Sequence, residues 1–278
     1  MAPNTSPFPA VRLQHGHVWR ADGRCEPVSR PTPVEVAVGL SMDGRPHTVL
    51  MATPGDYEDL AMGFVVSEAI ADAADVQAIE VREVADGVLV DLRLTPSAPR
   101  KRGRPRGLEG RSSCGLCGVQ RLADVMRPLP VVESSRRFAP EAVQRAVLSL
   151  DDRQALGRET RATHAAAFAT PDGVVALLRE DVGRHNALDK LGGALLRAGM
   201  DPARGFIVVT SRCSFEMVEK TARFGAPMIV AISAPTDLAI RRAEDAGVTL
   251  VALARDDGHT VFSHPQRLGL TTEALAHA

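Results

Sequence analysis

The last third of the chain alternates short apolar segments with helices, and this alternation constrains the fold more than any other feature. Three such segments, at 205–211, 227–233 and 248–254, are as short and apolar as buried strands. The segments between them have helical periodicity, and an earlier helix ends at Gly199. Strands that are apolar on both faces and separated by helices are typical of parallel sheets with right-handed crossovers. The pattern predicts an α/β domain over 118–278.

The first 95 residues are expected to contain a smaller, β-rich unit. Residues 1–30 are rich in Pro, Arg and His without a clear period, and we interpret them as an irregular N-terminal lead-in. Residues 31–95 form the expected α+β domain. Its expected elements are two strands at 33–40 and 45–52, a helix at 55–70 with Asp56 as its N-cap, and a hairpin at 76–94 that turns at Asp86-Gly87.

A basic segment separates these two domains. Residues 96–117 combine Pro, Gly, Arg and Lys without periodicity, and we expect a flexible loop there. The α/β domain is expected to begin with further elements before its regular part. These are helices at about 118–126 and 140–156, and a hairpin at 163–181 that turns at 171–173.

Composition excludes several classes of function. The net charge of −1 gives no overall reason to expect binding to nucleic acid or to a membrane, and an aromatic content of 4% disfavours base-stacking platforms. No segment of the sequence is apolar for long enough to span a bilayer, and the N-terminal segment lacks the apolar core of a signal peptide. The chain is therefore expected to be cytoplasmic, where thiols stay reduced.

The C-terminal ends of parallel strands lie on one edge of a sheet, and open α/β folds bind ligands at this edge. Two of these ends lead here into helix N-termini, whose amides favour anions such as phosphate. Each polar residue nearby is explained by capping or by a solvated charge, but the set is equally compatible with a phosphate-bearing ligand. The set is Ser211, Arg212, Ser214, Ser233 and Thr236 at the strand ends, with Arg179, Arg184, His185, Asn186 and Lys190 before them.

Two thiols lie two residues apart in RSSCGLCG, at the end of the basic segment. Cys114 and Cys117 are compatible with zinc binding, redox chemistry, sulfur transfer or a structural turn. A structural zinc site normally needs a second close pair of ligands, whereas Cys25 and Cys213 are isolated along the chain, so we expect no zinc. A thioredoxin-like motif follows an early strand of a compact domain, unlike this one, although the spacing permits a reversible disulfide.

Sulfur transfer requires a thiolate that is reactive, accessible and able to move. A thiol with a pKa of about 8.5 is only a few per cent ionised at neutral pH, and nearby cations and a helix N-terminus increase that fraction. Arg111, Arg121 and the helix expected after Gly118 are such groups, and the glycines beside the thiols leave the backbone uncrowded. The sequence therefore favours a persulfide carrier over two inert thiols in a turn.

Several motifs together resemble one family, the FdhD proteins, which are sulfurtransferases required for active formate dehydrogenases. The matching motifs cover most of the chain from about residue 110 onward. They are RSSCGLCG, THAAAFA, REDVGRHNALDKLGG, SRCSFEMVEKTARFGAP, ISAPTDLAI and HTVFSHPQRL. The N-terminal strands and TPGDYEDLAMGFVVSEAI are similar to the family more loosely.

This resemblance implies a reaction and a set of site residues. FdhD-like proteins take sulfur from a cysteine desulfurase and pass it to the molybdenum cofactor, bis-(molybdopterin guanine dinucleotide), before that cofactor enters the catalytic subunit of formate dehydrogenase. By the resemblance, Cys114 carries the persulfide and Cys117 has a supporting role. A guanine nucleotide is expected to occupy the same site as the cofactor. The implied cofactor-binding residues are Leu253, Ala254, Arg255, Asp256, Asp257 and Gly258.

The resemblance also implies an architecture and an assembly. The C-terminal domain is expected to be a three-layer α/β sandwich similar to the cytidine deaminase fold, and the chain is expected to form a homodimer. Two other functions stay open: a non-catalytic chaperone that binds the cofactor and docks on formate dehydrogenase, and a redox-sensing dithiol. His164, His185 and Asp181 are interpreted as core or capping residues and not as acid–base groups.

Overall fold

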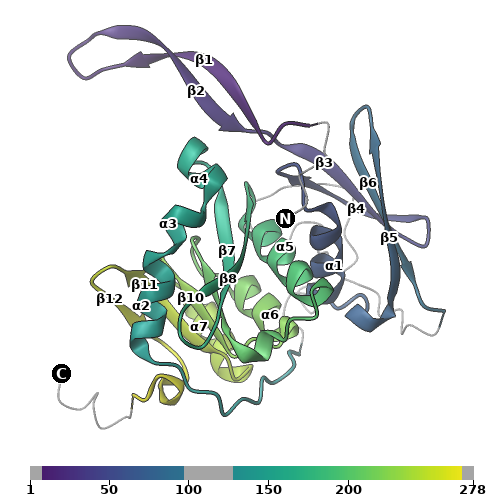
Figure 1. The fold of residues 1–278 in the computed structure, drawn as a ribbon, viewed down its shortest axis with the longest axis vertical. Helices are drawn as coiled ribbons and strands as arrows, with labels where there is room; N and C mark the ends of the chain where they lie inside the picture. Colours follow the sequence, from purple (N-terminus) through teal and green to yellow (C-terminus); the bar gives the residue numbers. More distant parts are fainter. Residues whose placement is uncertain (1–7, 97–127, 271–278) are drawn as a thin grey trace.

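The computed structural model describes residues 8–96 and 128–270, which form a mixed α/β structure (Figure 1). These residues make three sheets: a two-stranded sheet β1-β2, a four-stranded sheet in the order β4-β3-β6-β5, and a six-stranded sheet in the order β12-β11-β10-β9-β7-β8. The expected α/β class is therefore confirmed. The specific likeness to cytidine deaminase and the division into domains stay predictions.

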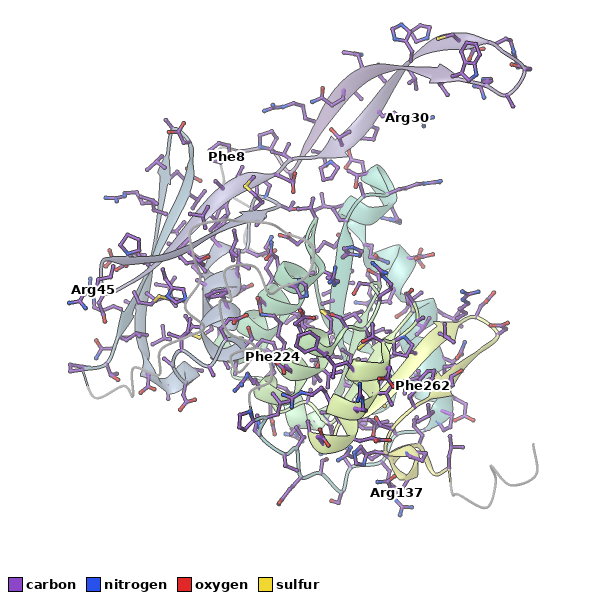
Figure 2. All side chains as sticks on the ribbon, turned by 180° about the vertical axis from the view of Figure 1, so that it is seen from behind. Phe8, Arg30, Arg45, Arg137, Phe224 and Phe262 are labelled. Atoms are coloured by element: carbon purple, nitrogen blue, oxygen red, sulfur yellow. The ribbon has the colours of Figure 1, made fainter. Side chains whose placement is uncertain are left out.

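The strands β1 (Val11–Trp19) and β2 (Cys25–Pro33) form an antiparallel hairpin, hereafter the arm, which projects away from the rest of the molecule (Figures 1 and 2, with Arg30 labelled). The expectation of an irregular lead-in over residues 1–30 is therefore wrong for residues 11–30, which form this hairpin. No residue of either strand of the arm is buried: each is exposed or only partly buried. Because neither face is buried, the sequence lacks the apolar–polar alternation from which strands are predicted.

The four-stranded sheet consists of the four strands expected between residues 31 and 95. The antiparallel hairpins β3–β4 and β5–β6 meet through a parallel pairing of β3 with β6. One face of this sheet packs against α1, and together they enclose an apolar core. The elements are β3 (Val36–Met42), β4 (Arg45–Ala52), α1 (Tyr57–Ser67), β5 (Val76–Val84) and β6 (Gly87–Leu94), with the 3-10 turn η1 (Ala73–Asp75) before β5.

Two local expectations in this region are corrected. Val84 pairs with Gly87, so the two residues of the hairpin turn are Ala85 and Asp86 and not Asp86 and Gly87. Asp56 does occupy the N-cap position of α1, but its backbone is left-handed with φ 53° and its side chain makes no capping hydrogen bond. Its carboxylate instead lies 3.5 Å from Nε of Arg179. Asp56 therefore marked the start of the helix correctly, but the sequence did not predict its ion pair with Arg179.

The six-stranded sheet contains the predicted parallel strands at its centre. β10 pairs in parallel with both β9 and β11, while the flanking strands are antiparallel: β7 to both β8 and β9, and β12 to β11. The predicted hairpin at 163–181 is β7–β8. The strands are β7 (His164–Ala169), β8 (Val175–Asp181), β9 (Phe206–Val209), β10 (Met228–Ala231), β11 (Thr249–Arg255) and β12 (Gly258–Val261).

Helices cover both faces of this sheet, which gives three layers (Figure 1). Successive strand residues point to opposite faces, so Ile207 packs under α5, α6 and α7 while Val208 packs under α2 and α3. The helix expected at 140–156 is divided into three short helices. The helices are α2 (Pro140–Leu148), α3 (Leu150–Arg153), α4 (Ala155–Thr160), α5 (Arg184–Arg197), α6 (Phe215–Phe224) and α7 (Asp237–Asp245), with 3-10 turns η3 (Pro202–Arg204) and η4 (Pro265–Leu268).

Helices α1 and α5 join the four-stranded sheet to the six-stranded one. They cross so closely that a Cβ at Gly63 would lie 1.8 Å from the carbonyl oxygen of Asp189. A buried lysine reinforces the junction, because Nζ of Lys220 in α6 lies 2.8 Å from both carboxylate oxygens of Asp189 and 2.8 Å from Oγ of Ser67 in α1. A buried ion pair is favourable only when further hydrogen bonds complete it, as here. The junction therefore fixes α5 against α1, which packs on the four-stranded sheet.

Candidate functional site

Four strands of the six-stranded sheet end at the same edge. β9, β10 and β11 run parallel, and β8 has the same direction because β7 is antiparallel to both β8 and β9. The helices α5, α6 and α7 each begin just after one of these strand ends. Three helix N-termini therefore converge on the edge where open α/β folds bind ligands, as the sequence predicted for the last two.

The loops at this edge are tied to one another through their backbones. Cys213, before α6, forms a parallel bridge with Pro235, before α7; its N–H donates to the carbonyl of Ala234. The Thr236 N–H donates in return to the carbonyl of Cys213, and the Thr236 hydroxyl accepts from an amide of the first turn of α7. Backbone hydrogen bonds therefore join these two loops, and Thr236 has the capping role that the sequence allowed.

Burial explains why Cys213 is not a reactive thiol. Its side chain is fully buried in the core under the helices, and burial raises the pKa of the Cys213 thiol to about 12. A thiol that remains protonated at neutral pH is a poor nucleophile and a poor metal ligand. Cys213 therefore packs, although it lies in a loop of the ligand edge.

Three of the polar residues that the sequence analysis proposed as phosphate ligands instead bind residues of the segment 51–59. Arg179 donates to the Asp59 carboxylate at 2.8 and 3.0 Å, and the Asn186 amide donates to the Met51 carbonyl at 2.8 Å. Lys190 is buried, with Nζ 2.8 Å from a carboxylate oxygen of Asp181 and 2.8 Å from the Thr53 carbonyl. These contacts position the start of α5. They remove Arg179, Asn186 and Lys190 from the set of phosphate ligands.

The segment expected to bind the cofactor forms the end of β11 and the turn into β12. Leu253 lies at a register shift between the two strands, and its backbone is left-handed with φ 54°. A bulky residue rarely adopts this conformation, and such outliers occur mainly at functional sites. The Leu253 N–H donates to the Ser233 carbonyl at 3.3 Å, which ties this bulge to the edge after β10. Leu253 is also exposed, so its side chain is available to a ligand.

The remaining residues of the segment, 254–258, differ in which of their atoms are accessible to a ligand. Ala254 is fully buried against the α2 side of the sheet, so only its backbone is available. Arg255, Asp256 and Asp257 are exposed, and the Arg255 carbonyl accepts a hydrogen bond from the Gln144 side chain. Gly258 has φ 156° and begins β12. Whether these residues bind a cofactor stays a prediction.

Cys114 and Cys117 lie outside the described residues, as does the helix expected at 118–126. The flexible loop expected at 96–117 falls there too, apart from its first residue. Among residues 8–96 and 128–270, no group of three or more His, Cys, Asp or Glu side chains is arranged to hold a metal ion.

Four ionisable residues meet at the other end of the same edge. His164 begins β7 and pairs with Asp181 at the end of β8, while Arg184 begins α5 and Glu216 lies in the first turn of α6. Burial and then the charge of Arg184 lower the pKa of His164, and Asp181 opposes them. Burial raises the pKa of Glu216, against hydrogen bonds from Ser214 and its own backbone and the charge of Arg184.

Sequence reasoning missed this cluster. It placed the edge correctly from the parallel strands, but β7 runs against them, so its first residue and not its last reaches the edge. Only the pairing of β7 with both β8 and β9 brings His164 there. The signal in the sequence was the hairpin itself, which places His164 opposite Asp181 once its turn is located at 171–173.

The described residues form a mixed α/β protein in which three helix N-termini meet at one edge of the six-stranded sheet. Comparison with known proteins is more specific. The chain belongs to the FdhD/NarQ family, whose model matches residues 33–269, a span that includes Cys114 and Cys117. The arm lies almost entirely before this span.

Two relatives illustrate the similarity. The chain is 49% identical over 236 residues to the sulfur carrier protein FdhD of Cupriavidus necator, covering 84% of this chain and 82% of that one. It is 46% identical over 269 residues to the sulfur carrier protein FdhD of Xanthomonas campestris, covering 94% and 96%. The two matches therefore extend over more than four fifths of each protein.

A solved structure supports the fold. A crystal structure from Desulfotalea psychrophila, of a protein assigned as a formate dehydrogenase accessory protein, matches with a TM-score of 0.73. It covers 94% of this chain and all of that one at 23% identity. Within the described part of the chain, no helix has the length and apolarity needed to cross a membrane.

Proposed function

We propose that the protein is a sulfurtransferase that accepts sulfur from a cysteine desulfurase as a persulfide on Cys114. It passes this sulfur to bis-(molybdopterin guanine dinucleotide) carrying molybdenum or tungsten, and thereby enables formate dehydrogenase to become active. Cys117 supports release of the sulfur or protects Cys114 as a disulfide. The observation that carries the proposal is the 46–49% identity to proteins named sulfur carrier protein FdhD, over a span that contains both thiols.

The ligand edge supports the part of the proposal that concerns the cofactor. A guanine dinucleotide carries phosphates, for which helix N-termini supply amides and a positive dipole end. The bulge at Leu253 offers an exposed apolar side chain beside the Ser233 loop, as a flat base requires on one face. In this proposal residues 253–258 hold the cofactor, which is the substrate of the reaction, and a guanine nucleotide occupies the same site.

The proposal includes the setting in which the protein acts. It works in the cytoplasm, where thiols are reduced, and docks on the catalytic subunit of formate dehydrogenase to deliver the cofactor. It forms a homodimer, so that one particle presents two thiol-bearing segments and two cofactor sites. Nucleic acid and membranes take no part.

Replacement of Cys114 tests this function in cells. A strain that lacks the endogenous protein is complemented with wild type, Cys114→Ala or Cys25→Ala, and formate dehydrogenase activity is measured. Cys25 is an exposed thiol on the arm and serves as the matched control. We expect activity with wild type and Cys25→Ala and none with Cys114→Ala. Full activity with Cys114→Ala would favour a cofactor chaperone that transfers no sulfur.

A further inference from the structure

The arm has no role in the proposed function, and by itself it is an incomplete sheet. Its two strands project away from the rest of the molecule (Figure 1), and among the described residues they pair only with each other. A two-stranded hairpin is at best marginally stable in water, and a third strand or a packing partner stabilises it. The arm therefore offers a surface that another chain segment can complete.

The backbone of β1 has an open edge. The Val34 N–H donates to the Ala10 carbonyl at one end of the arm, and the Arg20 N–H donates to the Arg24 carbonyl at the other, both at 2.9 Å. Because backbone groups alternate in direction along a strand, the even-numbered residues of β1 bond to β2 and the odd-numbered ones point away from it. The outward N–H and carbonyl groups belong to Val11, Leu13, His15, His17 and Trp19.

The edge of β2 is closed to further strands. By the same alternation, five residues of β2 point outward, and three of them are Pro27, Pro31 and Pro33. Proline has no N–H, and prolines on an edge strand prevent another strand from pairing there. A further strand can therefore add to the arm beside β1 and not beside β2.

One face of the arm is apolar along the edge of β1. Leu13 and Trp19 lie on this face with 58% and 71% of their surface exposed. A hollow lies between them at the middle of the arm, lined by residues that include His15, His17 and Pro27. Side chains of an added strand alternate between the two faces, so every second one would contact this surface.

The opposite face of the arm is basic. The arm contains four arginines and two carboxylates, whereas the whole chain has a net charge of −1. Two of the arginines lie in ion pairs with these carboxylates, but Arg12 and Arg30 form no ion pair with any described residue. Arg12 lies opposite Thr32, two residues from Arg30, so these two exposed guanidinium groups share one face. Their charge favours an anionic partner.

Charge also distinguishes between a second copy of the chain and a different partner. Antiparallel pairing of β1 with a second β1, centred on Gly16, would place Leu13 opposite Trp19. The same register would place Arg12 opposite Arg20, and like charges directly opposite each other destabilise a sheet. A strand with a carboxylate at that position would pair with Arg12 instead.

We propose that the edge of β1 binds an extended acidic segment of another protein, which adds to the arm as a third strand. Its apolar side chains lie against Leu13 and Trp19, and its carboxylates face Arg12 and Arg30. Main-chain hydrogen bonds supply affinity in this mode of recognition, and the alternating side chains supply specificity. The inference does not depend on sulfur transfer by Cys114.

Fluorescence of Trp19, the one tryptophan of the chain, reports strand addition directly. The purified protein is titrated with two end-blocked nine-residue peptides, in which valine alternates either with glutamate or with lysine. Because valine side chains would cover the indole, we expect a saturable blue shift with the glutamate peptide. The lysine peptide should bind at least about 10-fold more weakly, since like charges repel across the strands.

Proline substitutions identify the edge that binds. His15 and Ser29 lie opposite each other, and their N–H groups point outward at the edges of β1 and β2 respectively. His15→Pro removes a donor at the edge of β1 and should weaken binding of the glutamate peptide by about 10-fold. Ser29→Pro is the matched control, because both variants lose the same 2.8 Å hydrogen bond between the two side chains. It should bind the peptide as wild type does.

Reversal of one charge tests the acidic character of the partner without a change in the backbone. Arg12 is exposed, so Arg12→Glu should leave the arm folded. We expect the variant to bind the glutamate peptide about 10-fold more weakly than wild type does, and the lysine peptide more tightly. This comparison decides the question even if His15→Pro disrupts the arm.

Several outcomes would overturn the inference. One is a glutamate peptide that leaves the Trp19 fluorescence of wild type unchanged, and another is equal binding by His15→Pro and Ser29→Pro. A dimer that light scattering detects in wild type and Ser29→Pro but not in His15→Pro would assign the edge to a second copy. A blue shift with a nine-nucleotide single-stranded DNA, and with neither peptide, would assign the arm to nucleic acid. Persulfide formation on Cys114 is measured separately, so these outcomes leave the proposed sulfur transfer untouched.

Discussion

Arg267 shows how a single side chain supports several segments at once. Its guanidinium is buried and donates to the carbonyls of Val132, Ser134, Pro227 and Gly247 at 2.6–3.3 Å. The guanidinium thereby ties the C-terminal turn η4 to the starts of β10 and β11. These contacts give a structural reason for the arginine in HPQRL, which the sequence analysis counted among the motifs that resemble the family.

Replacement of Arg267 by lysine should destabilise the fold. Lysine keeps the charge but cannot reach carbonyls in several directions, so buried acceptors lose their donors. We expect the free energy of unfolding in urea to fall by about 2–3 kcal/mol. Arg241→Lys, in an exposed pair with Asp237, should change it by less than about 0.5 kcal/mol. Equal stability of the two variants would contradict the structural role.

Glu216 should make the stability of the protein depend on pH. Because burial raises its pKa in the folded state, its stabilising contribution is complete below the ordinary carboxyl pKa of about 4.3 and is lost as pH rises through the folded value. Glu216→Gln resembles the protonated form. Denaturant titrations should show the variant and wild type equally stable near pH 4, and the variant more stable as pH approaches 7.

A neighbouring carboxylate provides the control for this pH dependence. Glu219, one turn further along α6, lies 2.7 Å from a guanidinium nitrogen of Arg242. Glu219→Gln should therefore lower the stability at pH 7, opposite to Glu216→Gln. A stability difference between Glu216→Gln and wild type that shrinks from pH 4 to pH 7 would contradict the assignment.

At the scale of elements, the crossing of α1 and α5 depends on two glycines. A Cβ at Gly193 would lie 1.9 Å from the carbonyl oxygen of Asp59, and one at Gly63 would meet Asp189 as closely. Alanine favours a helix by about 1 kcal/mol over glycine, but here it would force the backbones apart.

Gly63→Ala should therefore destabilise the protein despite its helix propensity. We expect the free energy of unfolding to fall by at least about 2 kcal/mol, as overpacking does. Gly157→Ala in α4 is the matched control, because the nearest atoms to its Cβ would be side-chain atoms at 3.2 Å or more, from Glu180 and Gln154, and not a backbone carbonyl. It should change stability by no more than about 1 kcal/mol. A stabilising Gly63→Ala would show that the helices are further apart.

Most of the elements that the sequence predicted are buried on one face or on both, and the largely exposed β5 is an exception. β3, β4, β9, β10 and β11 carry the expected apolar patterns, and each forms within a few residues of its predicted position. The arm could not be predicted, because both of its faces are exposed. The breaks between α2, α3 and α4 also left no clear signal, since the polar residues of 149–156 are compatible with one continuous helix.

At the scale of the whole molecule, the arm should behave independently of the body. Trp19 is the one tryptophan of the chain and is 71% exposed on the arm. We expect native fluorescence typical of a hydrated indole, with little change where far-UV circular dichroism reports unfolding of the body. A large blue shift in the native state would show that the arm packs against another surface, such as a second copy of the chain.

The candidate site was predictable only in part. The parallel strands predicted the edge of the sheet where helix N-termini meet, whereas Cys114 and residues 253–258 stay predictions from the resemblance. The left-handed backbone of Leu253 depends on the register of β11 with β12, and the clustering of His164 with Glu216 depends on the order of four strands. Such properties arise from tertiary pairing, which a single sequence does not determine.

Peptide mass spectrometry after incubation with a cysteine desulfurase and free cysteine shows whether sulfur passes through Cys114. We expect the Cys114 peptide to gain one sulfur atom that a reductant removes, and the corresponding peptide of Cys114→Ala to gain none. A Cys114 peptide that stays unmodified while the desulfurase is active would contradict the account.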